Sequence, residues 1–258
     1  TIATEYSLIL KEYGPEAVYI HYASGVQDSN IRNFVKCLAI VNGGYLNYYG
    51  SYSSGQIGQA MPFVYGKRAG NGLSDVAKSG MVVLFGDNSC ETKMSGGRPT
   101  YHYMKGLETS GAKVVVIDPR YTETVAAHAD QWIPIRPGTD LAMMLAVAQV
   151  LFEEDLVDHE FIDEWVEKDG YEQWRAYVMG EGEDGIKKTP EWAAPITAVP
   201  AVTIREFARL YGSTKPVHLQ YFYSCAKRHM GDYSASASML LQAMTGNIAC
   251  PGGCETGA

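Results

Sequence analysis

The chain has 258 residues and a formal net charge of −8, with 29 acidic against 21 basic side chains. This balance excludes the basic surface with which a nucleic-acid-binding protein neutralises phosphates. Hydrophobic residues make up 46% of the chain, which excludes a disordered protein, and no apolar run is long enough to span a bilayer. Glycine and tyrosine are frequent while charged residues are only 19%, which predicts extensive loops packed around a cofactor or against a larger protein.

The first part of the chain is predicted to contain two helices, one strand and a long irregular segment. Residues 5–13 have helical character and lead into a β-branched and aromatic run at 17–22, which predicts a strand. Asn30 is placed to cap a helix that continues to about residue 40. The segment 42–55 follows no period, and irregular segments of this length are usually functional.

From residue 74 onward, strands and helices alternate. The apolar runs at 81–85 and 113–118 are typical of parallel strands buried on both faces. The other predicted strands are 131–135 and 217–222, and the predicted helices are 99–110, 140–153, 158–166, 203–211 and 233–244. Residues 180–200 are predicted to be a surface excursion. This order predicts an α/β fold with a doubly wound parallel sheet, in which ligands bind beyond the carboxyl ends of the strands.

Small or hydrogen-bonding residues follow three of the predicted strands. Gly86 and Asn88 come after the first strand, Asp118 after the second, and Gly138 and Asp140 shortly after the third. A carboxylate can accept both the N1–H and the exocyclic amine of guanine, and both aspartates are placed to do so. The residues alone leave a structural interpretation open for each, which is a turn residue for Asp118 and a helix N-cap for Asp140.

The motifs of several common enzyme classes are absent from the sequence. There is no Gly-x-Gly-x-x-Gly after the first strand, no P-loop and no Gly-x-Ser-x-Gly elbow, so the chain lacks the main signals of NAD, P-loop and serine hydrolase chemistry. The five cysteines include no Cys-x-x-Cys pair, and only Cys250 and Cys254 are close in sequence. We expect buried or incidental thiols there rather than a metal site.

Five ordered segments resemble the dimethyl sulfoxide reductase family of molybdopterin oxidoreductases. They are NGGYLNYYGSYSSGQ at 42–56, LFGDNSCET at 84–92, IDPRYTET at 117–124, WIPIRPGTD at 132–140 and TGNIACPGG at 245–253. Each segment alone is a weak signal, whereas five in this order are specific. The chain is most similar to a central fragment of the catalytic subunit of the membrane-bound type.

The resemblance implies a cofactor, molybdenum bis(molybdopterin guanine dinucleotide), and assigns roles to particular residues. Ser53 would be the catalytic residue and the oxygen ligand of the metal, whereas its spacing alone favours a turn residue. The cofactor-binding residues would be Gly86 and Asn88 on the phosphate path, Asp118 and Arg120 at the ribose and guanine, and Gly138 and Asp140 at the guanine. An alkoxide is a hard ligand that suits a high-valent metal carrying an oxo group.

The resemblance also implies domains, an activity and partners. Residues 75–212 would form the dinucleotide-binding domain, and residues 1–74 and 213–258 two parts of a second, discontinuous α/β domain. The parent enzyme would reduce an S-oxide or N-oxide, such as dimethyl sulfoxide, in a membrane-bound complex at the periplasmic or extracytoplasmic face of the cell membrane. An iron–sulfur cluster is expected in an N-terminal part outside this chain. The partners would be an iron–sulfur electron-transfer subunit and a membrane-anchor subunit.

Two alternatives stay open at this point. One is another molybdenum reaction of the same family, such as reductive dehydroxylation. The other is a non-catalytic guanine-nucleotide-binding module, which would use Asp118 and Asp140 but would have no need of Ser53. We expect the 258 residues by themselves to fold without turning over substrate, because half of the cofactor cradle would be missing.

Overall fold

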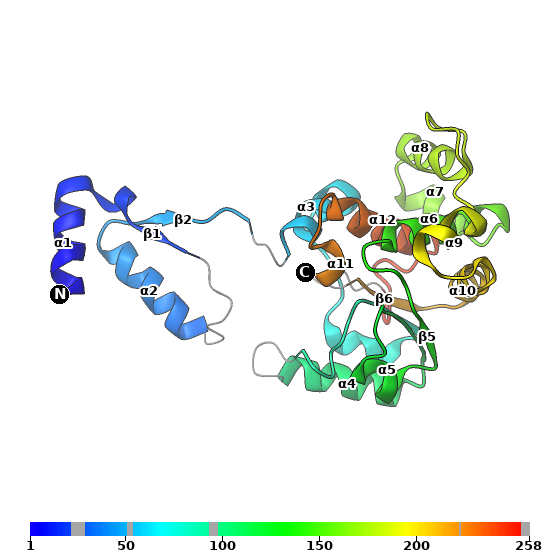
Figure 1. Cartoon of the computed structure of the whole chain (residues 1–258), viewed down its shortest axis with the longest axis horizontal. Coiled ribbons are helices and arrows are strands. Elements are labelled where there is room, and N and C mark those ends of the chain that lie inside the picture. Colours follow the sequence, from blue (N-terminus) through cyan, green and yellow to red (C-terminus); the bar gives the residue numbers. More distant parts are fainter. Residues whose placement is uncertain (22–28, 51–53, 93–97, 222, 254–258) are drawn as a thin grey trace. The chain divides into compact units, whose positions relative to one another are not determined.

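The computed structural model describes residues 1–21, 29–50, 54–92, 98–221 and 223–253 (Figure 1). The chain divides into two units by its internal contacts. The first comprises residues 1–51 with 94–98, and the second comprises residues 52–93 with 99–258. The domain boundaries near residues 74 and 212 stay a prediction from the sequence.

The first unit contains two helices and a pair of short parallel strands. Its elements are α1 (Ile2–Tyr13), a 3-10 turn (Pro15–Ala17), β1 (Tyr19–Ile20), α2 (Ser29–Val41) and β2 (Leu46–Asn47). Both predicted helices are confirmed, but α2 begins at Ser29, so Asn30 lies inside the helix and the prediction that it caps the helix is wrong. The predicted strand is shorter in the structure, because among the described residues only Tyr19 and Ile20 find pairing partners, in β2. β2 itself lies in the segment predicted to be irregular.

The second unit is built on a four-stranded parallel sheet. Its strands are β3 (Met81–Phe85), β4 (Lys113–Ile117), β5 (Gln131–Ile133) and β6 (Val217–Tyr221), in the order β5–β4–β3–β6. Phe85 lies opposite Ile117 on one side and opposite Tyr221 on the other. The four predicted strands and their parallel arrangement are therefore confirmed.

Helices cover both faces of this sheet (Figure 1). Val82 and Leu84 belong to a core cluster with Tyr103, on the face covered by α4 (Arg98–Ser110) and α5 (Glu123–His128). Val83 and Phe85 point to the opposite face, whose core includes α6 (Asp140–Glu153). Because α6 is apolar around its whole circumference, it is suited to this central position: every residue from 142 to 151 is buried.

The second unit contains further helices besides α4, α5 and α6. They are α3 (Gly55–Tyr65), a 3-10 helix (Leu73–Lys78), α7 (His159–Trp165), α8 (Lys168–Met179), α9 (Pro190–Thr197), α10 (Ala201–Ser213), α11 (Tyr223–Ala226) and α12 (Gly231–Met244). α6 packs against α8, α9, α10 and α12, and α12 also packs against α3.

The prediction that residues 180–200 form a surface excursion is wrong for their second half. α9 lies in this segment, and its Ala193 and Thr197 are buried. The helix forms because Thr189 caps it by accepting a hydrogen bond from the Trp192 backbone N–H, while Pro190 occupies the first turn, where no N–H is needed.

Candidate functional site

The carboxyl ends of the parallel strands meet at one edge of the sheet. Ser53 lies outside the described residues, and the other predicted site residues are all on loops or helix starts that follow β3, β4 and β5. The strand order reverses between β3 and β6, because the chain leaves β3 towards β4 and returns to its other side as β6. Parallel sheets open a ligand crevice at such a switch point.

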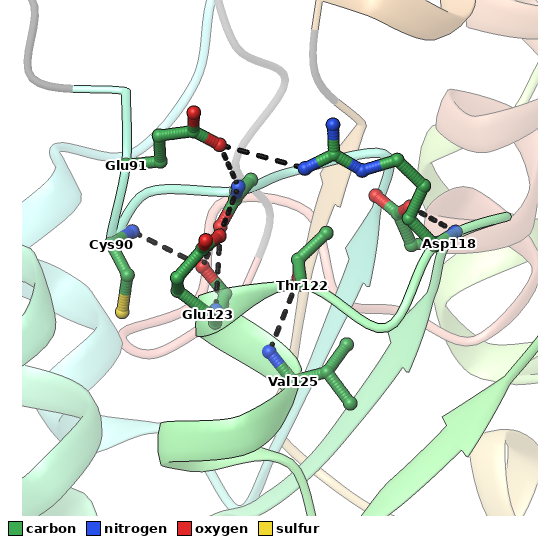
Figure 2. Close-up of polar contacts among 9 residues, drawn as sticks. Cys90, Glu91, Asp118, Thr122, Glu123 and Val125 are labelled. Atoms are coloured by element: carbon green, nitrogen blue, oxygen red, sulfur yellow. Dashed lines mark hydrogen bonds and ion pairs between the residues drawn. The ribbon is translucent and has the colours of Figure 1, made fainter.

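Asn88 joins the loop after β3 to the loop after β4. Its Nδ2 donates to Glu91 Oε2 at 2.7 Å and to Glu123 Oε2 at 3.0 Å. Its Oδ1 accepts from Thr124 Oγ1 at 2.8 Å, and the same hydroxyl oxygen accepts from the Cys90 backbone N–H at 3.1 Å. Figure 2 shows this network bridging the two loops. The side chain of Asn88 thus fixes the shape of the sheet edge.

Asp118 directly follows β4, and its carboxyl has both a turn contact and a raised pKa. Its Oδ1 accepts from the Arg120 backbone N–H at 2.8 Å, so the turn interpretation of this residue is confirmed (Figure 2). Its backbone oxygen accepts from Trp132 Nε1 at 2.9 Å. Burial raises the pKa of the carboxyl, and only Arg120 opposes this effect. The Arg120 guanidinium itself is exposed and lies 3.5 Å from Glu91 Oε2.

Asp87 is a buried carboxyl that the sequence analysis does not assign to the site. It follows Gly86, whose φ of +61° turns the chain sharply at the end of β3. Its Oδ1 accepts from Ser89 Oγ at 2.5 Å, whereas its Oδ2 is buried without a hydrogen-bond partner among the described residues. Burial raises the pKa of Asp87 to about 6, and the charge of Asp118 adds to the effect. The Gly-Asp-Asn string after a buried strand is the sequence signal for this residue.

Asp140 begins α6 and pairs with Arg228 from a distant part of the chain. The carboxyl is 5% exposed, and its Oδ2 lies 3.2 Å from Arg228 Nη2. Burial raises the pKa of Asp140 and the guanidinium lowers it. The N-cap of the helix is Thr139 rather than Asp140, so the capping interpretation of Asp140 is wrong. Gly138 has a φ of +82°, and a Cβ atom there would come within 3.0 Å of Arg228 Nη1.

Gln56 connects the Arg228 loop to the first turn of α3, next to the segment that carries Ser53. Its Nε2 donates to the Arg228 backbone oxygen at 2.5 Å, and its Oε1 accepts from the Asp232 backbone N–H at 2.8 Å. Gly231 closes the loop: a Cβ atom there would lie 2.0 Å from the Ala226 oxygen. One glutamine therefore holds the loop on which Arg228 faces Asp140.

The carboxyls at this edge make it a candidate binding site. Three carboxyls lie close enough for the charge of Asp118 to raise the pKa of both Asp87 and Asp140. Such a set binds groups that donate hydrogen bonds. Arg228 was not assigned from the sequence, and its pairing with Asp140 is a long-range contact without a local signal.

Metal-ligand clusters are not found in the described part of the chain. No group of three or more His, Cys, Asp or Glu side chains there is arranged to hold a metal ion. Burial raises the pKa of the Cys250 thiol, which is the state expected of a structural cysteine. Cys254 lies outside the described residues.

The fold and this edge define a class of protein, an α/β protein with a candidate ligand site beyond the carboxyl ends of parallel strands. The sequence profile of the molybdopterin oxidoreductase family matches residues 1–251. The chain therefore belongs to the molybdopterin oxidoreductase family, and this membership implies a molybdopterin cofactor.

Individual relatives are consistent with this family. The chain is 42% identical over 267 residues to a probable dimethyl sulfoxide reductase chain of Escherichia coli (strain K12), covering 98% of this chain and 33% of the relative. It is 41% identical over 272 residues to a dimethyl sulfoxide reductase of the same organism, with the same coverage. It is 32% identical over 266 residues to the dimethyl sulfoxide/trimethylamine N-oxide reductase of Rhodobacter capsulatus, covering 98% of this chain and 32% of that protein. The chain thus spans about a third of the length of these relatives.

A solved structure has the same fold. Acetylene hydratase from Pelobacter acetylenicus matches with a TM-score of 0.65 and 23% sequence identity, covering 96% of this chain and 32% of that one. Among the described residues, no helix has the length and apolar character needed to cross a membrane.

Proposed function

We propose that this chain is a central part of the catalytic chain of an enzyme that reduces an S-oxide or N-oxide by oxygen-atom transfer to molybdenum. The observation that carries the proposal is the gathering of Asn88, Asp118 and Asp140 at one sheet edge in a chain of this family. The relatives named as dimethyl sulfoxide and trimethylamine N-oxide reductases support the substrate class.

In this proposal, residues 75–212 form a doubly wound dinucleotide-binding domain, and residues 1–74 and 213–258 contribute to a second, discontinuous domain. The cofactor is molybdenum bis(molybdopterin guanine dinucleotide). Asp140 and Gly138 hold one guanine, Asp118 and Arg120 lie at the ribose and guanine, and Gly86 and Asn88 line the phosphate path. Ser53 supplies the oxygen ligand of the metal.

The described residues fit the guanine end of such a cofactor. Asp140 offers a buried carboxylate to N–H donors, Asp87 Oδ2 and Arg228 Nη1 are buried polar atoms without partners in the described structure, and a Cβ atom at Gly138 would crowd Arg228 Nη1 at 3.0 Å. Buried polar atoms are normally satisfied, so such atoms at a sheet edge support a ligand that satisfies them.

The bound cofactor supplies the oxygen-atom transfer and electron storage, which protein side chains cannot provide. The residues of this chain bind and orient it: Asp140 and Asp118 fix one nucleotide end, and the Asn88 network holds the two loops that face it. The proposed partners are an iron–sulfur electron-transfer subunit and a membrane-anchor subunit at the periplasmic face of the membrane. An iron–sulfur cluster is proposed for the N-terminal part of the longer enzyme.

The test uses the full-length enzyme that contains this segment, produced in a host that makes the cofactor. We expect about one molybdenum and about two GMP released by acid hydrolysis per chain, and reduction of dimethyl sulfoxide or trimethylamine N-oxide with a reduced dye. Ser53→Ala should abolish turnover, because the metal loses its oxygen ligand, while GMP content is retained.

The matched control is Ser54→Ala at the neighbouring serine, whose side chain makes no capping hydrogen bond to α3. This variant should keep its activity. GMP without molybdenum in the unmodified enzyme would favour the non-catalytic nucleotide-binding module. A full molybdenum content without reduction of either oxide would favour another reaction of the family, and the absence of both molybdenum and GMP would refute the proposal.

A further inference from the structure

The two terminal guanidinium nitrogens of Arg228, which lie near the start of α6, differ in their hydrogen-bond partners. Nη2 lies 3.2 Å from Asp140 Oδ2 and donates to Ser234 Oγ at 2.6 Å. Nη1 is buried and has no hydrogen-bond partner within the described part of the chain. One nitrogen therefore holds the guanidinium in place, and the other is a donor without an acceptor.

A buried donor without an acceptor is costly, and the cost is larger for a charged group. The loop around Arg228 does not relieve it, because Gln56 and Gly231 fix the backbone there. Nη1 lies beside Gly138, at the point where a Cβ atom would touch it. The missing acceptor is thus expected at Gly138 and Asp140, which is where a ligand of Asp140 would lie.

Guanine carries two hydrogen-bond donors followed by one acceptor along one edge, which matches a carboxylate beside a cationic N–H. Its exocyclic amine and N1–H are donors, and O6 beside N1 is an acceptor. A carboxylate accepts from the first two groups, and an adjacent cationic N–H satisfies the third. Because a carboxylate oxygen has two acceptor positions, Asp140 Oδ2 can keep its contact with Arg228 while it binds the base.

We propose that Arg228 is a specificity-determining residue that donates from Nη1 to O6 of the guanine held by Asp140. This inference rests on the guanine site of the proposed function and adds a second residue that recognises the base. The charge of Arg228 also lowers the pKa of Asp140 and so opposes the effect of burial, which raises it. Asp140 and Arg228 together then match the three polar groups of the guanine edge.

The test is isothermal titration of the full chain with three mononucleotides. GMP carries all three groups, IMP lacks the exocyclic amine, and thioguanosine monophosphate carries sulfur, a weak acceptor, in place of O6. For the unmodified chain, we expect GMP to bind about tenfold more tightly than either analogue, the value for one lost hydrogen bond to a charged group.

Two variants separate the contribution of Arg228 from that of Asp140. Arg228→Lys keeps a positive charge beside Asp140 but has no second nitrogen, so it should retain the preference for GMP over IMP and lose the preference over the thio analogue to within about twofold. Asp140→Asn should lose the preference over IMP. Circular dichroism of each variant checks that it is folded.

Each outcome decides one of the two assignments. Equal affinity of the unmodified chain for GMP and its thio analogue, or an unchanged thio preference in Arg228→Lys, would overturn the role of Arg228 and leave the guanine site intact. Equal affinity for GMP and IMP in the unmodified chain would overturn the guanine assignment of Asp140. The absence of any GMP binding would overturn both.

Discussion

Two buried titratable groups of the sheet, His218 and Asp87, should give the chain opposite pH dependences of stability. Burial lowers the pKa of His218, on β6, from 6.5 to about 4. Burial raises the pKa of Asp87, after β3, from 3.8 to about 6. His218 Nε2 lies 3.3 Å from Gln220 Oε1, and burial of the ring favours the neutral imidazole.

The direction in which stability changes with pH follows from which state, folded or unfolded, binds more protons. Between pH 6.5 and about 4, the unfolded chain binds a proton at His218 that the folded chain does not, so stability falls as the pH falls. Between pH 3.8 and about 6, the folded chain holds a proton on Asp87 that the unfolded chain has released, so stability falls as the pH rises. Each difference corresponds to about 3 kcal/mol, and the two contributions nearly cancel in the shared window.

Urea unfolding of His218→Leu and Asp87→Asn across this pH range separates the two contributions. The difference in unfolding free energy from the unmodified chain isolates each group. Relative to the unmodified chain, His218→Leu should gain about 3 kcal/mol as the pH falls from 6.5 to about 4. Asp87→Asn should gain a similar amount as the pH rises from 3.8 to about 6. A difference that does not change with pH would refute the reasoning for that residue.

Two further predictions concern a buried lysine and a tightly packed glycine. Lys188 is buried and donates to Asp184 Oδ2 and to the Ile186 oxygen. Lys188→Met should therefore lower the free energy of unfolding in urea by about 2 kcal/mol. The control Lys187→Met, at a half-exposed ion pair, should lower it by less than about 1 kcal/mol. Equal costs would contradict the buried role. Gly231→Ala should lower the melting temperature by about 5 °C or more, because its Cβ atom would collide with a backbone oxygen. Gly72→Ala, where the Cβ atom would meet Ser74 Oγ at an ordinary 3.9 Å and φ is −71°, should leave the melting temperature nearly unchanged, and an equal fall would contradict the collision.

Much of the sheet could be predicted from the sequence, because its signals are local. The apolar runs of β3 and β4 and the all-round apolar α6 each specify a buried element within a few residues. The missed helices have mixed signals: α3 contains Pro62, α9 contains Pro195, and α8 carries Gly170 in its first turn. In these helices tertiary packing and capping outweigh intrinsic propensity.

The candidate site could be predicted only in part, because only some of its features have signals that are local in the sequence. Asp118 and Asp140 follow strand ends, and the carboxyl edge of a parallel sheet is a general place for ligands. The contact of Asp140 with Arg228, and that of Gln56 with the same loop, join residues far apart in sequence. No local pattern encodes such contacts, so they had to come from the structure.

The position of β3 has a consequence for synthesis. This strand is the first of its sheet to leave the ribosome, yet β6, which covers one of its two edges, follows about 130 residues later. At about 5–20 residues per second, that edge waits roughly 7 to 26 s for its partner. An apolar strand with an open row of backbone donors and acceptors can pair wrongly during this interval. The edge that β6 covers is therefore the part of this sheet with the longest exposure to aggregation before folding is complete.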